Sequence, residues 1–158
     1  MANVLPSIHA VLPEIVLLTG ACILLIVDLF IDDARRYVTY WLAQLVLAAS
    51  AVVTLAPCHA GHPPFACGGT VVADVLSDVR KPVTLGAVSL VLFYSRSYLA
   101  QRVLCRGEFY LLVLFATVGM LVMISASHFL TLYLGLELLS LASYALVALD
   151  RDSRASTE

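Results

Sequence analysis

The sequence predicts an all-α, polytopic transmembrane helix bundle, and three observations support this class. Of the 158 residues, 61% are hydrophobic and 13% are charged, whereas a soluble domain has roughly 45–50% apolar and about 25% charged residues. The apolar residues gather in stretches long enough to cross a lipid core of about 30 Å, which takes about 20 helical residues. Short charged segments separate these stretches. A soluble globule and a disordered chain are therefore excluded, because each needs far more polar residues.

Five apolar stretches predict about five transmembrane helices in a single membrane domain. They cover about residues 12–31, 38–56, 82–99, 109–126 and 129–149. The first two are each close to the length of one span. The third opens with Pro82, and a first helical turn tolerates proline because its missing N–H would have no intrahelical partner. Only Ser127 and His128 join the last two stretches, so we expect these helices to be antiparallel neighbours.

The distribution of basic residues predicts the orientation of the chain. If the N-terminus lies outside, seven of the nine basic residues fall on the inner side, and only Arg80 and Lys81 fall on the outer side. Positive charge accumulates on the cytoplasmic side of membrane proteins. We therefore expect a periplasmic N-terminus, an external loop at 57–81 and a cytoplasmic tail at 150–158. A net charge of −2 leaves no basic surface for nucleic acid.

The external loop holds two of the four cysteines, Cys58 and Cys67, among prolines, glycines and two histidines. Their spacing matches no zinc-binding pattern, so no metal site is predicted. In an oxidising compartment the two thiols form a disulfide or stay free, and the sequence leaves both interpretations open. Cys22 in the first helix and Cys105 on the reducing side are predicted to be ordinary small side chains.

Glu137 is the main candidate for chemistry, because ionisable residues inside a membrane are costly and usually functional. It lies at least eight residues, or about 12 Å, from either end of the predicted fifth helix. Tyr133, Ser140 and Tyr144 share its face at helical spacing, so this polar stripe must face protein or water. Glu137 is interpreted as a proton-transfer carboxylate, or alternatively as a protonated residue in a packing seam. No lysine lies within the predicted spans, so a cationic partner must come from elsewhere.

Four other ionisable residues are secondary candidates. Glu14 and Asp28 lie near opposite ends of the first helix, where a side chain still reaches water, and this favours structural roles. His128 begins the fifth helix, which favours a capping or interfacial role over proton relay. Lys81, the only lysine, is predicted at the mouth of the third helix.

The residues also carry a resemblance to a known family. The stretch from Glu108 to Leu149, with the core LGLELLSLASYALVAL, resembles the fourth and fifth helices of subunit N of bacterial proton-pumping NADH:quinone oxidoreductase, respiratory complex I. The LPEI sequence at 12–15, the later Asp28 and the segment 74–81 resemble the start of the same subunit. The likeness covers essentially the whole chain, and it implies the N-terminal portion of an antiporter-like fold of about fourteen helices.

In that family the glutamate matched by Glu137 pairs with a lysine on a later helix, so the resemblance implies a proton-transfer role for Glu137. It also implies that electron transfer from NADH to quinone, in neighbouring subunits, drives the proton movement. The chain itself has no dinucleotide motif and no iron–sulfur spacing, so we expect it to bind no cofactor.

The implied partners are the other membrane subunits of complex I, lipid, and the remaining helices of the same subunit if these are encoded separately. The implied location is the bacterial inner membrane. One alternative is a subunit of a related cation/proton antiporter or membrane-bound hydrogenase. Another is a structural assembly scaffold that has no proton path.

Overall fold

The computed structural model describes residues 4–30, 36–55, 65–66, 71–72, 75–101 and 107–149. Its five helices are α1 (Val4–Phe30), α2 (Arg36–Leu55), α3 (Val75–Gln101), α4 (Gly107–Ser125) and α5 (Phe129–Leu149). Two short strands, β1 (Phe65–Ala66) and β2 (Val71–Val72), form an antiparallel ladder. The predicted all-α transmembrane class is confirmed, with this ladder added inside the segment that was predicted as a loop.

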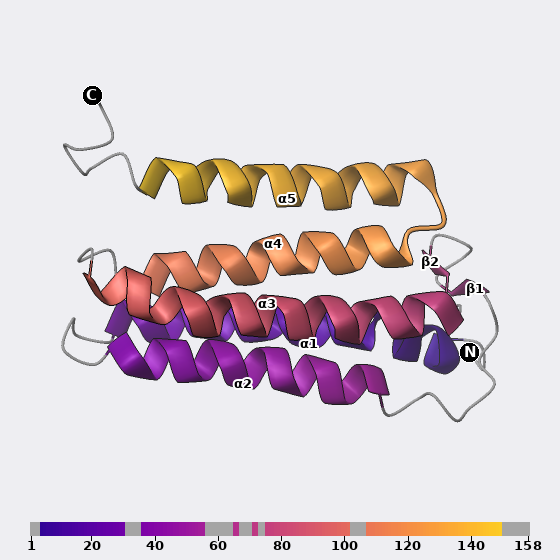
Figure 1. Ribbon diagram of the computed structural model, residues 1–158. Coiled ribbons are helices and arrows are strands. Elements are labelled where there is room, and N and C mark those ends of the chain that lie inside the picture. The colour runs from indigo at the N-terminus through magenta and orange to yellow at the C-terminus, as the bar shows by residue number, and fades with distance from the viewer. Residues whose placement is uncertain are drawn as a thin grey trace.

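Four of the described helices are long and apolar enough to cross a membrane by length and composition. They contain the spans Val11–Phe30, Tyr37–Leu55, Gly107–Ser125 and Phe129–Leu149. The remaining helix, α3, carries Asp78, Arg80, Lys81 and Arg96, and these charges lower its hydropathy. It nevertheless runs beside α2 and α4 and contacts both, so all five helices share one bundle (Figure 1).

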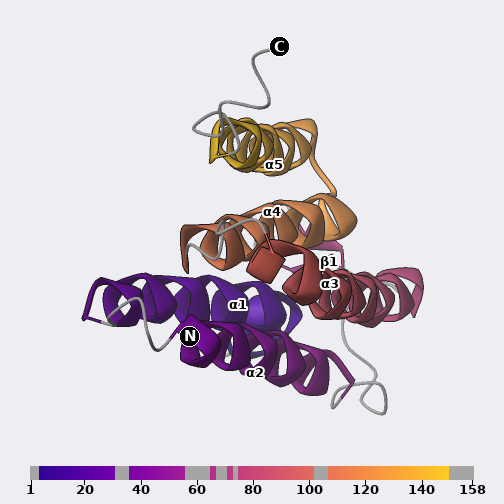
Figure 2. The same ribbon diagram turned by 60° about the vertical axis from the view of Figure 1, so that its left-hand side comes forward.

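The helices alternate in direction along the bundle, and α5 lies outermost, on α4 (Figures 1 and 2). The starts of α1, α3 and α5 meet the ends of α2 and α4 at one end of the bundle, here called the N-terminal end. The starts of α2 and α4 lie at the other end, here called the far end. Under the predicted orientation the N-terminal end is periplasmic.

The core lies among α1, α2, α3 and α4, where apolar side chains at helical spacing point inward. Its fully buried large residues are leucines: Leu17, Leu24, Leu47, Leu85, Leu92, Leu114 and Leu121. In contrast, α5 buries only Gly135 and Ala142 and packs chiefly on α4. Gly119 of α4 crosses Gly135 so closely that a Cβ on Gly119 would come within 2.8 Å of the Gly135 carbonyl oxygen. Small residues at such crossings let two membrane helices approach closely.

Two helices, α1 and α3, begin earlier than their predicted starts at residues 12 and 82. α1 begins at Val4 and α3 at Val75, so Pro13 and Pro82 lie inside helices. A proline lacks the N–H for one helical hydrogen bond and normally marks a helix start or a kink, which is why Pro82 was read as a first-turn residue. Asp78 in the first turn of α3 favours the earlier start, because a negative charge stabilises a helix N-terminus.

The other predicted helix ends differ little from the structure. α2 and α4 each begin two residues before the predicted 38 and 109, and α5 has the predicted bounds 129–149. The predicted external loop at 57–81 is shorter at its second end, because its last seven residues, 75–81, belong to α3.

Candidate functional site

A buried ion pair joins three helices near the N-terminal end of the bundle. The Nζ of Lys81 on α3 lies 2.9 Å from Oε1 of Glu14 on α1, and the two side chains are only 4% and 7% exposed. The Ser125 hydroxyl, at the last residue of α4, donates a hydrogen bond to the same oxygen at 2.6 Å. Within the described part of the chain, the other carboxylate oxygen of Glu14 is buried without a hydrogen-bond partner.

This pair corrects two predictions from the sequence. Glu14 was predicted to reach water, but α1, α3 and α4 enclose it. Lys81 was predicted at the mouth of a helix, but α3 begins at Val75, so Lys81 lies nearly two turns inside the helix and its side chain meets α1. The sequence held a usable signal, because alternating helices bring the starts of the first and third spans to the same end of a bundle. The prediction that the third helix starts at Pro82 placed Lys81 outside the helix, so its closeness to Glu14 was not predicted.

Asp28 lies at the far end of the bundle and contacts two other helices. The Thr39 hydroxyl on α2 donates a hydrogen bond to Asp28 Oδ1 at 3.0 Å. The carboxylate also lies beside Gly107, the first residue of α4, and it occupies the space that a Cβ on that residue would need. Because free N–H groups and partial positive charge concentrate at a helix N-terminus, this is a favourable place for an anion. This contact is not predictable from the sequence, because it depends on where Gly107 packs in the bundle.

His128 lies immediately before α5, in the position of a helix cap. Its Nδ1 accepts a hydrogen bond from the Leu130 N–H at 3.4 Å, and its carbonyl oxygen accepts one from the Leu132 N–H at 3.1 Å. These contacts satisfy N–H groups in the first turn, which have no partner within the helix.

Glu137 lies on the face of α5 that points away from the rest of the bundle. Gly135 is buried against α4, and at about 100° per residue Glu137 lies roughly 200° around the helix from it. Tyr133 and Tyr144, which share the face of Glu137, are 48% and 71% exposed, and Tyr133 interacts with the Glu137 carboxylate one turn away. Ser140, on the same stripe, is partly buried. Among the described residues, no basic side chain forms an ion pair with Glu137.

Several predictions concern residues outside the described ranges. These are the Cys58 and Cys67 pair, Cys105 and the tail at 150–158. Cys22 is described: it is a free, exposed cysteine on α1. Across the helices and strands that the structure describes, no three His, Cys, Asp or Glu residues form a group able to hold a metal ion.

Apolar helices that enclose one ion pair and carry a second, partly buried carboxylate in mid-helix define a multi-pass membrane protein with ionisable groups inside its helices. No family model matches the chain. Comparison with curated proteins, however, identifies its relatives. The chain is 50% identical over 147 residues, 93% of its length, to NADH-quinone oxidoreductase subunit N of Thiobacillus denitrificans. It is 46% identical over all 158 residues to that of Nitrosomonas europaea, and 47% identical over 152 residues, or 96%, to that of Methylovorus glucosotrophus.

These matches confirm the resemblance to the N-terminal part of subunit N that the sequence predicted. The chain spans 30%, 33% and 32% of the lengths of these three curated relatives. It is therefore related to one portion of a membrane subunit of the NADH-quinone oxidoreductase complex.

Proposed function

We propose that this chain forms part of a proton-translocating membrane subunit of an NADH-quinone oxidoreductase. In this proposal, other subunits transfer electrons from NADH to quinone, and the released energy moves protons through the subunit that contains the chain. The observation that carries the proposal is the identity of 43 to 50% with proteins named as subunit N, over nearly the whole chain. The chain would lie in the bacterial inner membrane with its N-terminus in the periplasm, among the other membrane subunits of complex I.

Glu137 is the proposed proton-transfer residue. It lies in mid-helix, away from water, where desolvation favours the protonated carboxyl and a nearby cation favours the charged carboxylate. A partner that brings a cation towards α5 and withdraws it would therefore make Glu137 release and bind a proton in turn. The outward direction of Glu137 on α5 supports this role, because a partner that packs on this face can approach the carboxylate directly.

The Glu14–Lys81 pair is a different kind of site. Lys81 and Ser125 already fix the carboxylate of Glu14, so its charge is compensated within the chain. A buried carboxylate whose charge is neutralised in this way holds helices together. We assign this pair a structural role and assign the change of protonation to Glu137.

The test is Glu137→Gln in the assembled complex, because glutamine keeps the size and hydrogen bonding of the side chain but removes the charge. We expect the complex to assemble and to lose proton pumping together with the tightly coupled part of its quinone reduction. Glu137→Asp should be milder, since it keeps the charge on a shorter side chain. Pumping is measured by the quenching of a pH-sensitive dye in proteoliposomes, and assembly by native gel electrophoresis.

Glu108→Gln is the matched control, because Glu108 is an exposed carboxylate in the first turn of α4. It should leave pumping unchanged. Normal pumping by an assembled Glu137→Gln complex would contradict the proposal and would favour the scaffold alternative. Purification of the chain with a cation/proton antiporter or a hydrogenase, without NADH dehydrogenase activity, would favour the other alternative.

A further inference from the structure

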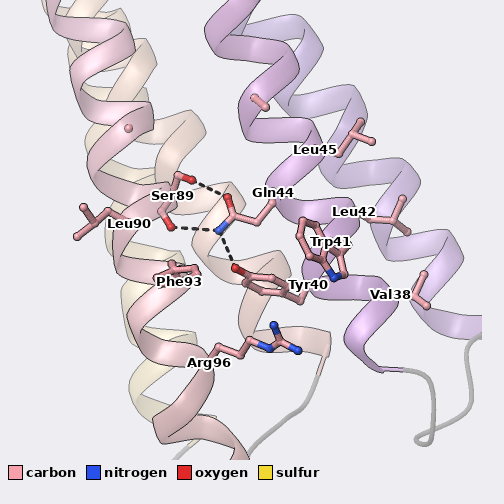
Figure 3. A pocket seen from close by; sticks show the side chains of 12 residues that line it. Val38, Tyr40, Trp41, Leu42, Gln44, Leu45, Ser89, Leu90, Phe93 and Arg96 are labelled. Atoms are coloured by element: carbon pink, nitrogen blue, oxygen red, sulfur yellow. Dashed lines mark hydrogen bonds between the residues drawn. The ribbon is translucent and has the colours of Figure 1, made fainter.

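A groove of about 900 Å³ lies between α2 and α3 (Figure 3). Its walls are mainly apolar and include Trp41, Leu45, Leu90 and Phe93, which are 60 to 66% exposed. Gly86 contributes only backbone, and a Cβ built on it meets no atom within 4 Å. The groove is therefore open space rather than a loosely packed core.

Hydrogen bonds join three polar side chains of the groove, Tyr40 and Gln44 on α2 and Ser89 on α3. The Gln44 side-chain amide donates to the Ser89 carbonyl oxygen at 3.1 Å and to the Tyr40 hydroxyl at 3.4 Å. The Ser89 hydroxyl in turn donates to Gln44 Oε1 at 2.6 Å. Because these three side chains bond to one another, an apolar guest can cover them without breaking their hydrogen bonds.

Arg96 marks the end of the groove nearest the far end of the bundle. Its guanidinium carbon lies 5.1 Å from the centre of the Tyr40 ring, and the side chain is exposed. In the described ranges, no carboxylate forms an ion pair with Arg96. Exposed Tyr37 and Tyr94 lie within a turn of Tyr40 and Arg96 along α2 and α3. Tyrosine and tryptophan gather at the level of the lipid head groups, so this end of the groove lies at the membrane surface.

We propose that this groove binds one acyl chain of an anionic glycerophospholipid whose phosphate is held by Arg96. Arginine binds phosphate through two parallel N–H bonds, and the cation–π contact with Tyr40 holds the guanidinium at this end of the groove. From Arg96 to Gly86 the groove follows ten residues of α3, or about 15 Å, which is half of a lipid core of about 30 Å. The groove thus has the depth of one leaflet. This inference is independent of the proposed function.

An anionic head group suits Arg96 better than a zwitterionic one. Arg96 supplies one positive charge that no described carboxylate neutralises. A choline head group would bring a second cation beside the guanidinium, whereas the glycerol head of phosphatidylglycerol carries no charge beyond its phosphate.

The test is native mass spectrometry of the full chain extracted from membranes, titrated with phosphatidylglycerol or with phosphatidylcholine. We expect one tightly retained phosphatidylglycerol on the unaltered chain and weaker retention of phosphatidylcholine. Arg96→Gln should weaken phosphatidylglycerol binding roughly fivefold, the effect of one basic residue at an anionic lipid surface. Arg80→Gln is the control, because Arg80 is an exposed arginine at the other end of the same helix, and it should bind like the unaltered chain.

Gly86→Leu tests the groove itself without altering charge. Its side chain has open space to occupy, so the chain should keep its helicity by circular dichroism and lose the tightly retained lipid. Equal lipid binding by Arg96→Gln and Arg80→Gln would overturn the role of Arg96. Unchanged binding by Gly86→Leu, or equal retention of both lipids, would overturn the acyl-chain site or its preference for an anionic head group. Absence of this lipid from the intact complex, with a protein helix in the groove instead, would also overturn it.

Discussion

Glu14 and Lys81 show how two buried charges are tolerated when each neutralises the other. Removing one partner leaves an uncompensated buried charge, which typically costs about 3–5 kcal/mol of stability. Replacing both with apolar residues of similar volume is often neutral. The contribution of the pair to the free energy of unfolding can therefore be measured only by substituting the two residues singly and together.

We predict that Glu14→Met and Lys81→Met each lower the free energy of unfolding by about 3–5 kcal/mol, and that the double variant regains most of the loss. The reason is that Lys81→Met leaves the buried Glu14 carboxylate without its cation, and Glu14→Met removes the carboxylate that faces Lys81, whereas the double variant removes both charges. Equilibrium unfolding in mixed detergent micelles measures all three in a double-mutant cycle. Additive losses in the double variant would show that the two side chains act separately.

At the scale of the helix pair, α4 and α5 depend on the crossing of Gly119 with Gly135. The close approach of the backbones leaves no room for a side chain at this point. Because α5 packs chiefly on α4, this crossing holds the helix that carries Glu137.

We predict that Gly119→Ala destabilises the bundle by about 1–3 kcal/mol, the usual effect of overpacking. The added Cβ would lie 2.8 Å from the Gly135 carbonyl oxygen and 2.9 Å from the Leu139 nitrogen, and backbone cannot move aside easily. Gly86→Ala is the control, because its Cβ meets open space, and it should be neutral or stabilising by up to about 1 kcal/mol, since alanine is favoured over glycine inside a helix. Equilibrium unfolding in mixed detergent micelles measures both variants. Equal free energies of unfolding would show that the two helices move apart at Gly119 without loss of stability.

At the scale of the whole molecule, the alternating helices place Glu14 and Asp28 at opposite ends of one bundle. The ion pair with Lys81 holds the N-terminal end, and the contact of Asp28 with α2 and α4 holds the far end. The basic residues predict which of these ends faces the cytoplasm.

We predict that reporter fusions after Arg36, Arg106 and Arg154 behave as cytoplasmic, and that a fusion near Gly68 behaves as external. Seven of the nine basic residues would then lie on the side where positive charge accumulates. Alkaline phosphatase and green fluorescent protein fusions report the two sides. The opposite pattern of activity would reverse the orientation.

The sequence predicted the helices most reliably where long apolar runs are bounded by charges or short links. The bounds of α5 and the stripe around Glu137 follow directly from such a run, because helical spacing fixes which residues share a face. The contacts of Glu14 and Asp28 were not predictable in this way, since they depend on side chains from separate helices. Pro82 also misled the prediction: a proline near a helix start and one inside a helix look alike in sequence, and only the packing of Lys81 distinguishes them.

The ion pair also has a consequence for the synthesis of the chain, because its members are made at different times. At about 5–20 residues per second, Glu14 waits for roughly 3 to 13 seconds before Lys81 is made, and Ser125 follows later still. During this interval Glu14 must stay neutral by binding a proton, or remain near the membrane surface, because an unpaired charge is costly in lipid. The buried position of Glu14 therefore depends on the arrival of α3, and the ion pair forms only once α1 and α3 have come together in the membrane.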